Sequence, residues 1–484
     1  MDITELASAI NGKIIGSTRY YNEEGFIGRF TFLGDAKPGD IVIRHWIDAK
    51  GIEIASYKNI SCLITLNPTD DAKEKTKELN FPLIICEKIE LATAFTLNWA
   101  YENYAKDAKS IIITGTNGKS TTSHLIYHIL NHSGFNVFTN TDSDSEFNTL
   151  CDPVVSKLIV DEVNNNGPLD YLVIEVSEVQ GWLGALMKGH AYLMSNALNP
   201  ICGVITNIAM DHIGLVNSID EVFDEIYQVP NSINDGFLVV NHDDNLVMKV
   251  VEDLDENVHP FYCSMNNLKS SKNNIFYDTD KQEIIYDNQA ILTIDDLPFN
   301  TNHFIQNILS AVASCISIGI PMENIVDGVR TYKALDRRFS KLNEKPLIYD
   351  DFAHNPDGIK ATIKETKKFV PKDGEFYVVC SIRGSRGVEI NQLNVEALVE
   401  AIDNKTNLIL SSSIDVVNDL NFVKDEEREI FFKVLDENKI DYLHYDNLVD
   451  VLTETYEKAN PQDVILLIGA QGMDPAEGLL KKII

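Results

Sequence analysis

The chain lacks any long apolar run. None of its hydrophobic stretches approaches the ~20 residues that a membrane-spanning helix needs, although 44% of its 484 residues are hydrophobic. The first five residues, Met-Asp-Ile-Thr-Glu, do not have the basic and apolar segments of a secretory signal peptide. These absences favour a cytoplasmic protein that does not insert into a membrane.

Paired cysteines are absent as well. The seven cysteines are widely separated, odd in number and never occur as C-x-x-C. This spacing argues against a disulfide framework and against a structural zinc site. Scattered single thiols are typical of a protein from a reducing compartment.

Positive charge is scarce. The chain has 41 Lys and Arg residues against 73 Asp and Glu residues, which gives a formal net charge of −32. Binding to a nucleic-acid backbone requires a basic surface, so we expect no nucleic-acid partner. A protein this acidic can bind a phosphorylated ligand only where it gathers its few cations and metal ions locally.

The pattern of short strands and helices predicts the α/β fold class with three domains. Residues 1–105 are expected to form a small N-terminal α/β domain, followed by a polar hinge at 101–109. Between 106 and 333, hydrophobic strands alternate with helices, which predicts a doubly wound parallel sheet, with a β-rich insert at 274–293. The alternation restarts at 334–484 and predicts a C-terminal Rossmann-like domain. The central strands are expected at 111–114, 172–175, 204–206 and 236–241.

The most informative motif is a shortened phosphate loop. A β-branched run ends at residue 114, GTNGKS follows at 115–120, and a helix begins there. Two glycines let backbone N–H groups turn toward a phosphate, and the helix N-terminus adds partial positive charge. The Walker A pattern also requires a glycine at 113, which is Ile113 here, so a turn without a ligand is the alternative. The predicted nucleotide-binding residues are Gly115, Thr116, Asn117, Gly118, Lys119, Ser120 and Thr121.

Within that loop, Lys119 is expected to reach the outer phosphates and Ser120 to bind Mg²⁺ through its hydroxyl. Glu175 ends another predicted buried strand, and strand ends face the ligand crevice in doubly wound folds. Its carboxylate is therefore a candidate Mg²⁺ ligand, or else an acid that caps a helix on a surface loop. His212 follows a third strand end; imidazole is an unusual Mg²⁺ ligand, so a structural role is the alternative.

The ordered set of motifs resembles the Mur ligase family of ATP-dependent enzymes that form amide bonds. The set comprises GTNGKS, IEVSE (174–178), TNIAMDH (206–212), NHDD (241–244), HFIQN (303–307), RRFS (337–340) and DDFAHNP (350–356). The resemblance implies a substrate-docking N-terminal domain, a central ATPase domain and a C-terminal Rossmann-like domain. The wording of several motifs is similar to archaeal pseudomurein peptide ligases. The N-terminal domain lacks the D-S-R triplet of UDP-binding relatives.

The resemblance also implies roles for individual residues. Lys119 contacts the γ-phosphate, and Ser120 and Glu175 hold one of two Mg²⁺ ions. His212 holds the second ion. Asn307 meets the adenine, Arg338 closes onto the phosphates, and Asp351 binds the ribose. His354 belongs to the same closing motif as Asp351.

One residue of the family pattern is missing. Most relatives carry a lysine 13 to 15 residues after the metal-binding histidine, and its carbamate supports the magnesium ions. Residues 220–228 contain no lysine, and alignment on the NHDD motif places Glu225 there, with Asp224 as its neighbour. We therefore expect Glu225 to act in catalysis as a metal ligand, since metals require negative oxygen at that place.

The acceptor pocket departs from the family too. Ligases that add meso-diaminopimelate carry a D-N-P-R stretch after a strand of the third domain; the corresponding stretch here, Ser-Ser-Ser-Ile-Asp-Val-Val at 411–417, lacks Pro and Arg, so that amino acid is not expected. Arg383 and Arg386 are candidates for binding the carboxylate of the incoming amino acid, because arginine can bind it through two hydrogen bonds. A solvated loop is the alternative.

Two further patterns are expected to be structural. His124, His128 and His132 recur every four residues on the helix after the phosphate loop, without a partner acid. The acidic run 425–429 has the composition of a solvated helix start.

The sequence thus predicts a ligase that uses ATP and Mg²⁺ to add an amino acid to a nucleotide-linked cell-wall precursor, with Lys119, Glu175, His212, Glu225 and Arg338 as catalytic residues. Its expected partners are small molecules: ATP, an amino acid and a UDP-linked peptide. A monomer or weak dimer is expected. The alternatives are a related ligase acting on a folate-like, cyanophycin-like or cofactor acid, and an ATP-binding scaffold without activity.

Overall fold

The computed structural model describes residues 1–141, 153–182, 185–210, 215–268, 273–298, 301–419 and 421–484. It divides the chain into two compact units, Met1–Tyr332 and Lys333–Ile484. Among the described residues, no helix has the length and apolar character that crossing a membrane requires. The predicted α/β class is confirmed, while the three domain boundaries remain predictions.

The first part of unit 1 is a five-stranded sheet with strand order β1-β5-β4-β3-β2. Strands β2 to β5 are parallel, and β1 pairs antiparallel with β5. The elements are α1 (Ile3–Ala9), β1 (Lys13–Ile15), β2 (Phe30–Thr31), β3 (Ile41–Ile47), α2 (Ala49–Tyr57), β4 (Cys62–Pro68), α3 (Asp70–Glu78), β5 (Leu83–Ile85) and α4 (Ile89–Tyr104).

The second part of unit 1 is a nine-stranded sheet with strand order β16-β15-β14-β13-β12-β11-β6-β8-β7. Neighbouring strands are parallel in the part of the sheet made of β7, β8, β6, β11, β12, β13 and β14. Strands β15 and β16 add antiparallel pairs at the β14 edge. They span β6 (Lys109–Thr114), β7 (Val137–Thr139), β8 (Tyr171–Glu175), β11 (Cys202–Ile205), β12 (Gly236–Asn241), β13 (Val258–Ser264), β14 (Asn274–Asp278), β15 (Glu283–Tyr286) and β16 (Gln289–Thr293). A small hairpin, β9 (Gly181–Trp182) and β10 (Ala185–Leu186), stands apart.

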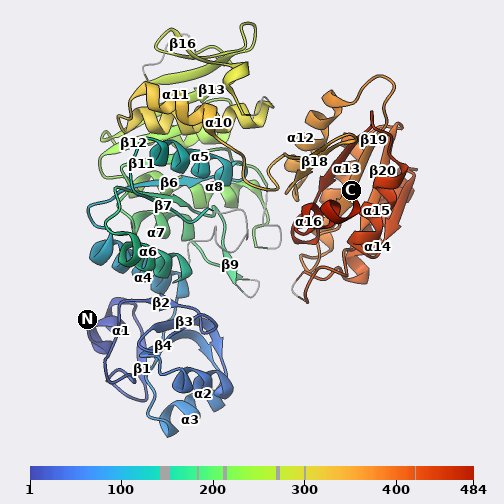
Figure 1. Cartoon of the computed structure of the whole chain (residues 1–484). Helices are drawn as coiled ribbons and strands as arrows, with labels where there is room; N and C mark the ends of the chain where they lie inside the picture. The colour runs from blue at the N-terminus through green and yellow to red at the C-terminus, as the bar shows by residue number, and fades with distance from the viewer. Residues whose placement is uncertain (142–152, 183–184, 211–214, 269–272, 299–300, 420) are drawn as a thin grey trace. The chain divides into compact units, whose positions relative to one another are not determined.

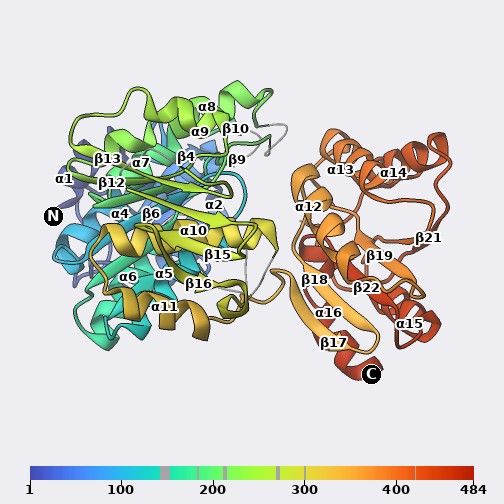
Figure 2. The same ribbon diagram turned by 90° about the horizontal axis from the view of Figure 1, so that it is seen from above.

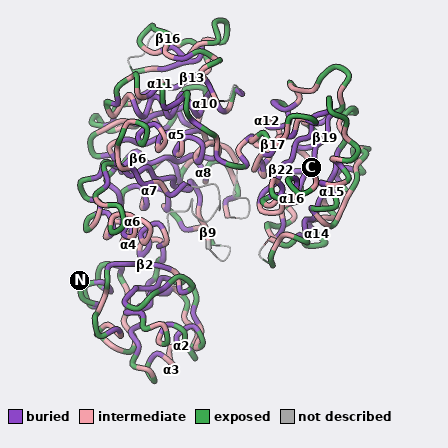
Figure 3. The backbone as a smooth tube through the Cα atoms, in the orientation of Figure 1, coloured by how far each residue is buried: buried purple, intermediate pink, exposed green. Residues whose placement is uncertain are grey.

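Helices cover both faces of this sheet, as a doubly wound fold requires (Figures 1 and 2). One face carries α5 (Lys119–His132), α10 (Asn302–Ser317) and α11 (Met322–Thr331), whose apolar side chains share one core with the sheet. Two cores lie on the other face. Their helices are α4, α6 (Pro153–Asn166), α7 (His190–Asn196), α8 (Ile219–Tyr227) and α9 (Asn245–Val251). The central strands are buried along nearly their whole length (Figure 3).

The predicted β-rich stretch 274–293 is present as β14, β15 and β16, but it is not a separate insert: β13, which was not predicted from the sequence, pairs with β14 and joins this stretch to the parallel sheet. The segment 101–109 is not a polar hinge either, because Tyr101, Ala105 and Ala108 are buried in the core beneath β6 and β8. Helix α4 itself packs its start on the N-terminal sheet and its end on the nine-stranded one.

Unit 2 is built on a six-stranded sheet with strand order β17-β18-β22-β19-β20-β21, parallel except at β17. Helices α12 to α14 pack on one face, and α15 and α16 pack on the other. The strands are β17 (Ser340–Glu344), β18 (Leu347–Asp351), β19 (Phe376–Ser381), β20 (Thr406–Ser411), β21 (Tyr442–Tyr445) and β22 (Val464–Ile468). The helices are α12 (Pro356–Thr366), α13 (Val388–Ala401), α14 (Asp425–Glu437), α15 (Leu448–Lys458) and α16 (Ala476–Ile483).

Candidate nucleotide-phosphate site

The site lies at the switch point of the nine-stranded sheet. Strand β6 sits between β8 and β11, and the chain continues from β6 toward β7 on one side before it crosses to β11 on the other. In open parallel sheets, ligands bind in the crevice beyond the carboxyl ends of the strands at such a point. The loops that follow β6, β7, β8 and β11 all lie at this edge.

Two glycines shape the phosphate loop. Gly115 has φ +119° and Gly118, the N-cap of α5, has φ +85°, a region that residues with a Cβ rarely adopt. A Cβ on Gly115 would also collide with the side chain of Thr206 and the backbone of Asn207, while one on Gly118 would collide with the Asn307 side chain. The loop is therefore packed tightly against α10 and the segment after β11.

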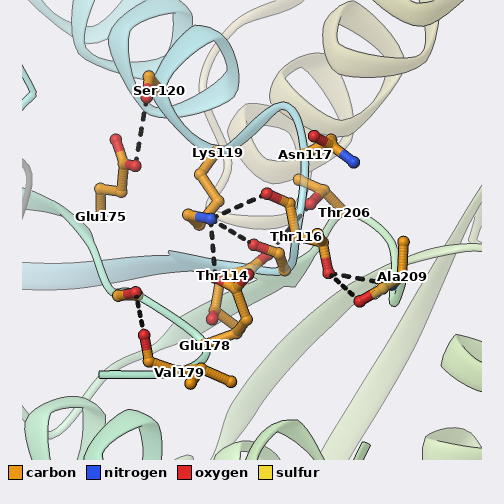
Figure 4. A network of polar contacts seen from close by, with 12 residues as sticks. Thr114, Thr116, Asn117, Lys119, Ser120, Glu175, Glu178, Val179, Thr206 and Ala209 are labelled. Atoms are coloured by element: carbon orange, nitrogen blue, oxygen red, sulfur yellow. Dashed lines mark hydrogen bonds and ion pairs between the residues drawn. The ribbon is translucent and has the colours of Figure 1, made fainter. Parts of the chain in front are cut away.

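The segment after β11 holds the middle of the loop in place (Figure 4). Asn207 exchanges hydrogen bonds with Asn117: the Asn117 N–H donates to Asn207 Oδ1 at 3.0 Å, and Asn207 Nδ2 donates to the Asn117 carbonyl at 2.8 Å. The Thr116 hydroxyl donates to the Ala209 carbonyl at 3.1 Å and accepts from the Ala209 N–H at 3.0 Å. Because these contacts join two loops, the loop backbone is fixed by tertiary structure.

Lys119 folds back over its own loop. Its Nζ donates to the carbonyls of Gly115 and Thr116 at 2.7 and 3.0 Å, and to Glu178 Oε2 at 2.7 Å. Glu178 follows β8 and its side chain is fully buried. The sequence prediction assigned no partner to this lysine.

Ser120 and Glu175 meet as predicted from their strand and helix ends. The Ser120 hydroxyl donates to Glu175 Oε1 at 3.2 Å, and Thr141 Oγ1 donates to Glu175 Oε2 at 3.1 Å. Asn140 fixes the backbone of Glu175 through two hydrogen bonds. Thr141 and Asn140 were missed, although they follow β7 and the same strand-end argument applies to them.

This donor set fits Mg²⁺. The ion prefers oxygen ligands and is usually held by one or two carboxylates together with water and substrate phosphates. A hydroxyl and a carboxylate at the mouth of a phosphate loop match that preference. Within the described part of the chain, no group of three or more His, Cys, Asp or Glu side chains could hold a metal, so a protein-only metal cage is not found there.

The remaining predicted metal ligands are less well placed. His212 lies outside the described residues. Both carboxylate oxygens of Glu225, on α8, accept the N–H of Gly189 at 3.0 and 2.8 Å, at the start of α7. Burial raises the pKa of Glu225, against the lowering effect of the Gly189 N–H. The structure thus gives Glu225 a helix-capping contact, and its metal role stays a prediction.

In unit 2, the predicted nucleotide contacts gather after β18. The half-buried guanidinium of Arg338 lies 5.0 Å from the Phe352 ring centre. Asp351 accepts N–H groups from Phe339 and Ala353 at 2.8 and 2.9 Å. His354 Nδ1 lies 2.9 Å from the Phe352 carbonyl. These residues share one loop cluster, and their roles toward a nucleotide stay predictions.

Arg337, the neighbour of Arg338, is a buried structural residue. Its guanidinium pairs with Asp350 at 3.2 Å, contacts Asp474 and donates to the Ala470 carbonyl at 3.0 Å. Burial raises the pKa of Asp350 to about 6, although the Arg337 charge lowers it. The clamp joins the first residues of unit 2 to the segment after β22.

The loop that carries Arg383 and Arg386 is organised by a buried acid. Glu427 on α14 is fully buried and accepts the N–H groups of Ser385, Arg386 and Gly387 at 2.9, 2.8 and 2.6 Å. The expectation of a solvated helix start is therefore wrong for Glu427. The Arg386 side chain is exposed and Arg383 is half-buried, and their binding of an amino acid stays a prediction.

The doubly wound sheet, the phosphate loop at its switch point and the Ser120–Glu175 pair define a P-loop nucleotide-binding protein of the α/β class. Residues 113–315 match the Mur ligase middle domain, and residues 337–471 match the Mur ligase glutamate ligase domain. The chain belongs to the Mur ligase family. Family members use ATP and Mg²⁺ and form carbon–nitrogen bonds between acids and amino acids, so the predicted enzyme class is confirmed at the level of the family.

Individual relatives are distant. A UDP-N-acetylmuramate–L-alanine ligase of Clostridium novyi is 28% identical over 54% of this chain, which spans about half (53%) of that relative's length. The MurF structure from Acinetobacter baumannii covers 100% of this chain and 98% of its own, with 17% identity and a TM-score of 0.66. A pseudomurein peptide ligase type C from Methanothermus fervidus covers 92% and 95%, with 20% identity and a TM-score of 0.59. At these identities the two structures support the fold.

Proposed function

We propose that this protein is an ATP-dependent ligase that adds an amino acid to a carboxylate of a nucleotide-linked cell-wall peptide precursor of pseudomurein or peptidoglycan type. The observation that supports this proposal most strongly is the grouping of Lys119, Ser120 and Glu175 around the phosphate loop of a Mur ligase fold. The substrate carboxylate attacks the γ-phosphorus of ATP and ADP leaves. The amine then attacks the acyl phosphate, releases phosphate and forms the amide.

The chain's own residues contribute mainly position and charge, on which phosphoryl transfer chiefly depends. The N–H groups at the start of α5 and the Lys119 ammonium bind the phosphates. The hydrogen bonds that Asn207 makes with Thr116 and Asn117 hold the backbone of the loop in place before a nucleotide arrives, so the loop backbone needs little reorganisation on binding. Bound Mg²⁺, held by Ser120 and Glu175, would neutralise charge on the phosphates.

The other assigned residues remain part of the proposal. His212 and Glu225 are candidate ligands of a second ion, and Asn307, whose side chain packs over Gly118, is the candidate adenine contact. Arg338, Asp351 and His354 are nucleotide contacts by family resemblance. Arg383 and Arg386 are candidates for the amino-acid carboxylate.

The acceptor is best sought among small amino acids first. Residues 411–417 lack the Pro and Arg of the corresponding stretch in ligases that add meso-diaminopimelate. The Clostridium novyi relative is named for L-alanine, and we extend that amino acid to this chain as the first candidate. The UDP carrier and the linkage are part of the same test.

The decisive experiment supplies the purified protein with ATP, Mg²⁺, UDP-linked muramyl or peptide acids and a panel of amino acids, with a folate-type acid as the alternative substrate. We expect phosphate release that requires both acid and amine, together with a product one amino acid heavier by mass spectrometry. Lys119→Met should abolish turnover, and Lys106→Met, which changes an exposed lysine, should not.

The outcomes separate the possibilities. Turnover only with the folate-type acid would move the enzyme outside wall synthesis, and no turnover with any pair would favour a scaffold. Glu225→Gln in the same assay tests the metal assignment: near-normal turnover in bicarbonate would remove Glu225 from the site and leave it as the cap of α7.

A further inference from the structure

Lys119 and Glu178 form an ion pair that the family motifs did not predict. The Nζ–Oε2 distance is 2.7 Å, the Glu178 side chain is 0% exposed and that of Lys119 is 14% exposed. Figure 4 shows the Glu178 side chain below the loop, on the segment that follows Glu175. A buried carboxylate in contact with an ammonium is a strong, charge-assisted hydrogen-bond partner.

The ammonium has three N–H groups, and at least three acceptors lie within hydrogen-bond distance of it: Glu178 and the carbonyls of Gly115 and Thr116. A phosphate oxygen that binds Nζ must therefore share with or displace one of these acceptors. The two carbonyls belong to a backbone held by Asn207 and Ala209. The Glu178 carboxylate is carried by a side chain with rotatable bonds, so it is the acceptor that can yield.

We propose that Glu178 is a positioning residue that competes with nucleotide phosphates for the third N–H group of Lys119, and that this competition sets the affinity of the site for nucleotide. The inference rests on the proposed function only in that the loop binds nucleotide. The carboxylate holds the ammonium in one position over the loop. A phosphate oxygen binds Lys119 by replacing Glu178 as the acceptor of that hydrogen bond.

The test is the binding of AMPPNP, a non-hydrolysable ATP analogue that has a γ-phosphate, to the full chain, measured by isothermal titration calorimetry. Glu178→Gln keeps the side-chain size and removes the charge, which leaves Lys119 with a weaker neutral acceptor. Because hydrogen bonds to charged groups are stronger than neutral ones, we expect AMPPNP to bind about tenfold more tightly. Unchanged or weaker binding would overturn the proposal. Glu74→Gln, which removes an exposed charge on α3, should leave the affinity unchanged.

Direct repulsion between Glu178 and the phosphates would also raise affinity when the charge is removed, and a double-mutant cycle separates the two causes. In a Lys119→Met background, Glu178→Gln should change AMPPNP affinity less than twofold. A tenfold gain that persists there would assign the effect to direct repulsion and reject the proposal.

A second measurement does not need nucleotide. Loss of the charge-assisted bond leaves the Lys119 amine less tightly held over the loop, so its rate of acetylation by acetic anhydride, read by peptide mass spectrometry, should rise in Glu178→Gln. An unchanged rate would mean that Glu178 does not act on Lys119. Both measurements remain valid if the protein binds AMPPNP but joins no acid to an amine, so the two proposals can fail separately.

Discussion

At the scale of single residues, the phosphate loop depends on positions where a Cβ is excluded for two independent reasons. Gly118 has a left-handed φ, and the space where its Cβ would lie is taken by the Asn307 side chain. Gly134, at the other end of α5, has a similar φ of +89° but open space around the missing Cβ. The two glycines therefore separate backbone strain from local crowding.

We expect Gly118→Ala to lower the affinity for ADP at least tenfold, because the new methyl group displaces Asn307 and shifts the N–H groups at the start of α5. The left-handed φ also costs about 1–2 kcal/mol of stability. Calorimetric titration with ADP and urea unfolding measure the two effects.

Gly134→Ala is the matched control for that substitution. It should lose a similar 1–2 kcal/mol of stability through its φ alone and keep wild-type affinity for ADP. Equal loss of affinity in both variants would mean that strain in α5, and not the contact with Asn307, controls the loop.

Neighbouring residues of the same type also differ in role. Arg337 is buried against Asp350 while Arg338 beside it is half-buried, and Glu427 is fully buried while Glu426 beside it is exposed. Composition cannot distinguish such pairs. The direction in which each Cα–Cβ bond points relative to the core decides which of the two is buried.

At the scale of elements, α5 links the phosphate loop to the end of α11 in unit 1. Its first turn carries Lys119 and Ser120, and its later turns contact the end of α11 through histidines. His124 Nδ1 lies 3.2 Å from the Tyr332 hydroxyl, and His128 Nε2 lies 3.0 Å from Thr331 Oγ1. The expectation of a structural role for these histidines agrees with these contacts.

This contact predicts an acid-sensitive stability. Burial, with a smaller effect of the His128 charge, lowers the pKa of His124 to about 4. Because the unfolded-state pKa is about 6.5, the unfolded chain binds more protons between pH 6.5 and 4, and stability falls as pH falls through that window. His124→Gln keeps a hydrogen-bonding group but cannot bind a proton in this range. The variant should therefore lose about 1–3 kcal/mol less folding stability than the wild-type protein as the pH falls.

Urea unfolding at pH 7 and pH 5 measures that difference. His259→Gln, on the exposed side of β13, is the control and should keep the wild-type pH dependence. Identical pH dependence of the His124 variant and the wild-type protein would show that the contact between α5 and α11 does not titrate.

At the scale of the whole molecule, each unit contains its own cores. Unit 2 buries separate clusters on the two faces of its six-stranded sheet, and the Arg337 clamp joins its first residues to the segment after β22. A chain of about 150 residues can bury a core sufficient for independent folding.

We therefore expect the fragment 333–484 to fold alone, with one cooperative urea transition followed by circular dichroism. A shorter fragment, 339–484, lacks Arg337 and leaves Asp350 as a buried unpaired acid, so it should be less stable by about 3 kcal/mol at neutral pH. Failure of the longer fragment to unfold cooperatively would mean that unit 2 depends on unit 1.

Much of the site could be predicted because its signals are local in sequence. GTNGKS between a strand and a helix predicts a phosphate loop, and a carboxylate at the end of the next central strand predicts Glu175. The alternation of strands and helices likewise predicted the parallel sheet. In such a sheet the carboxyl ends of the strands lie at the same edge, so residues that follow different strands come close together. Strand β13 was not predicted, because His259 and Pro260 interrupt its apolar run.

By itself, then, the sequence determined the fold class, the phosphate loop and the Ser120–Glu175 pair, because each rests on the chemistry of a short segment and the geometry of parallel strands. Only the tertiary structure decided that Glu178 pairs with Lys119, that Asn307 packs over Gly118 and that Glu427 supports the Arg386 loop. Those contacts join residues about 40 to 190 positions apart. Local pattern carries no information about such distances, which depend on how the elements pack.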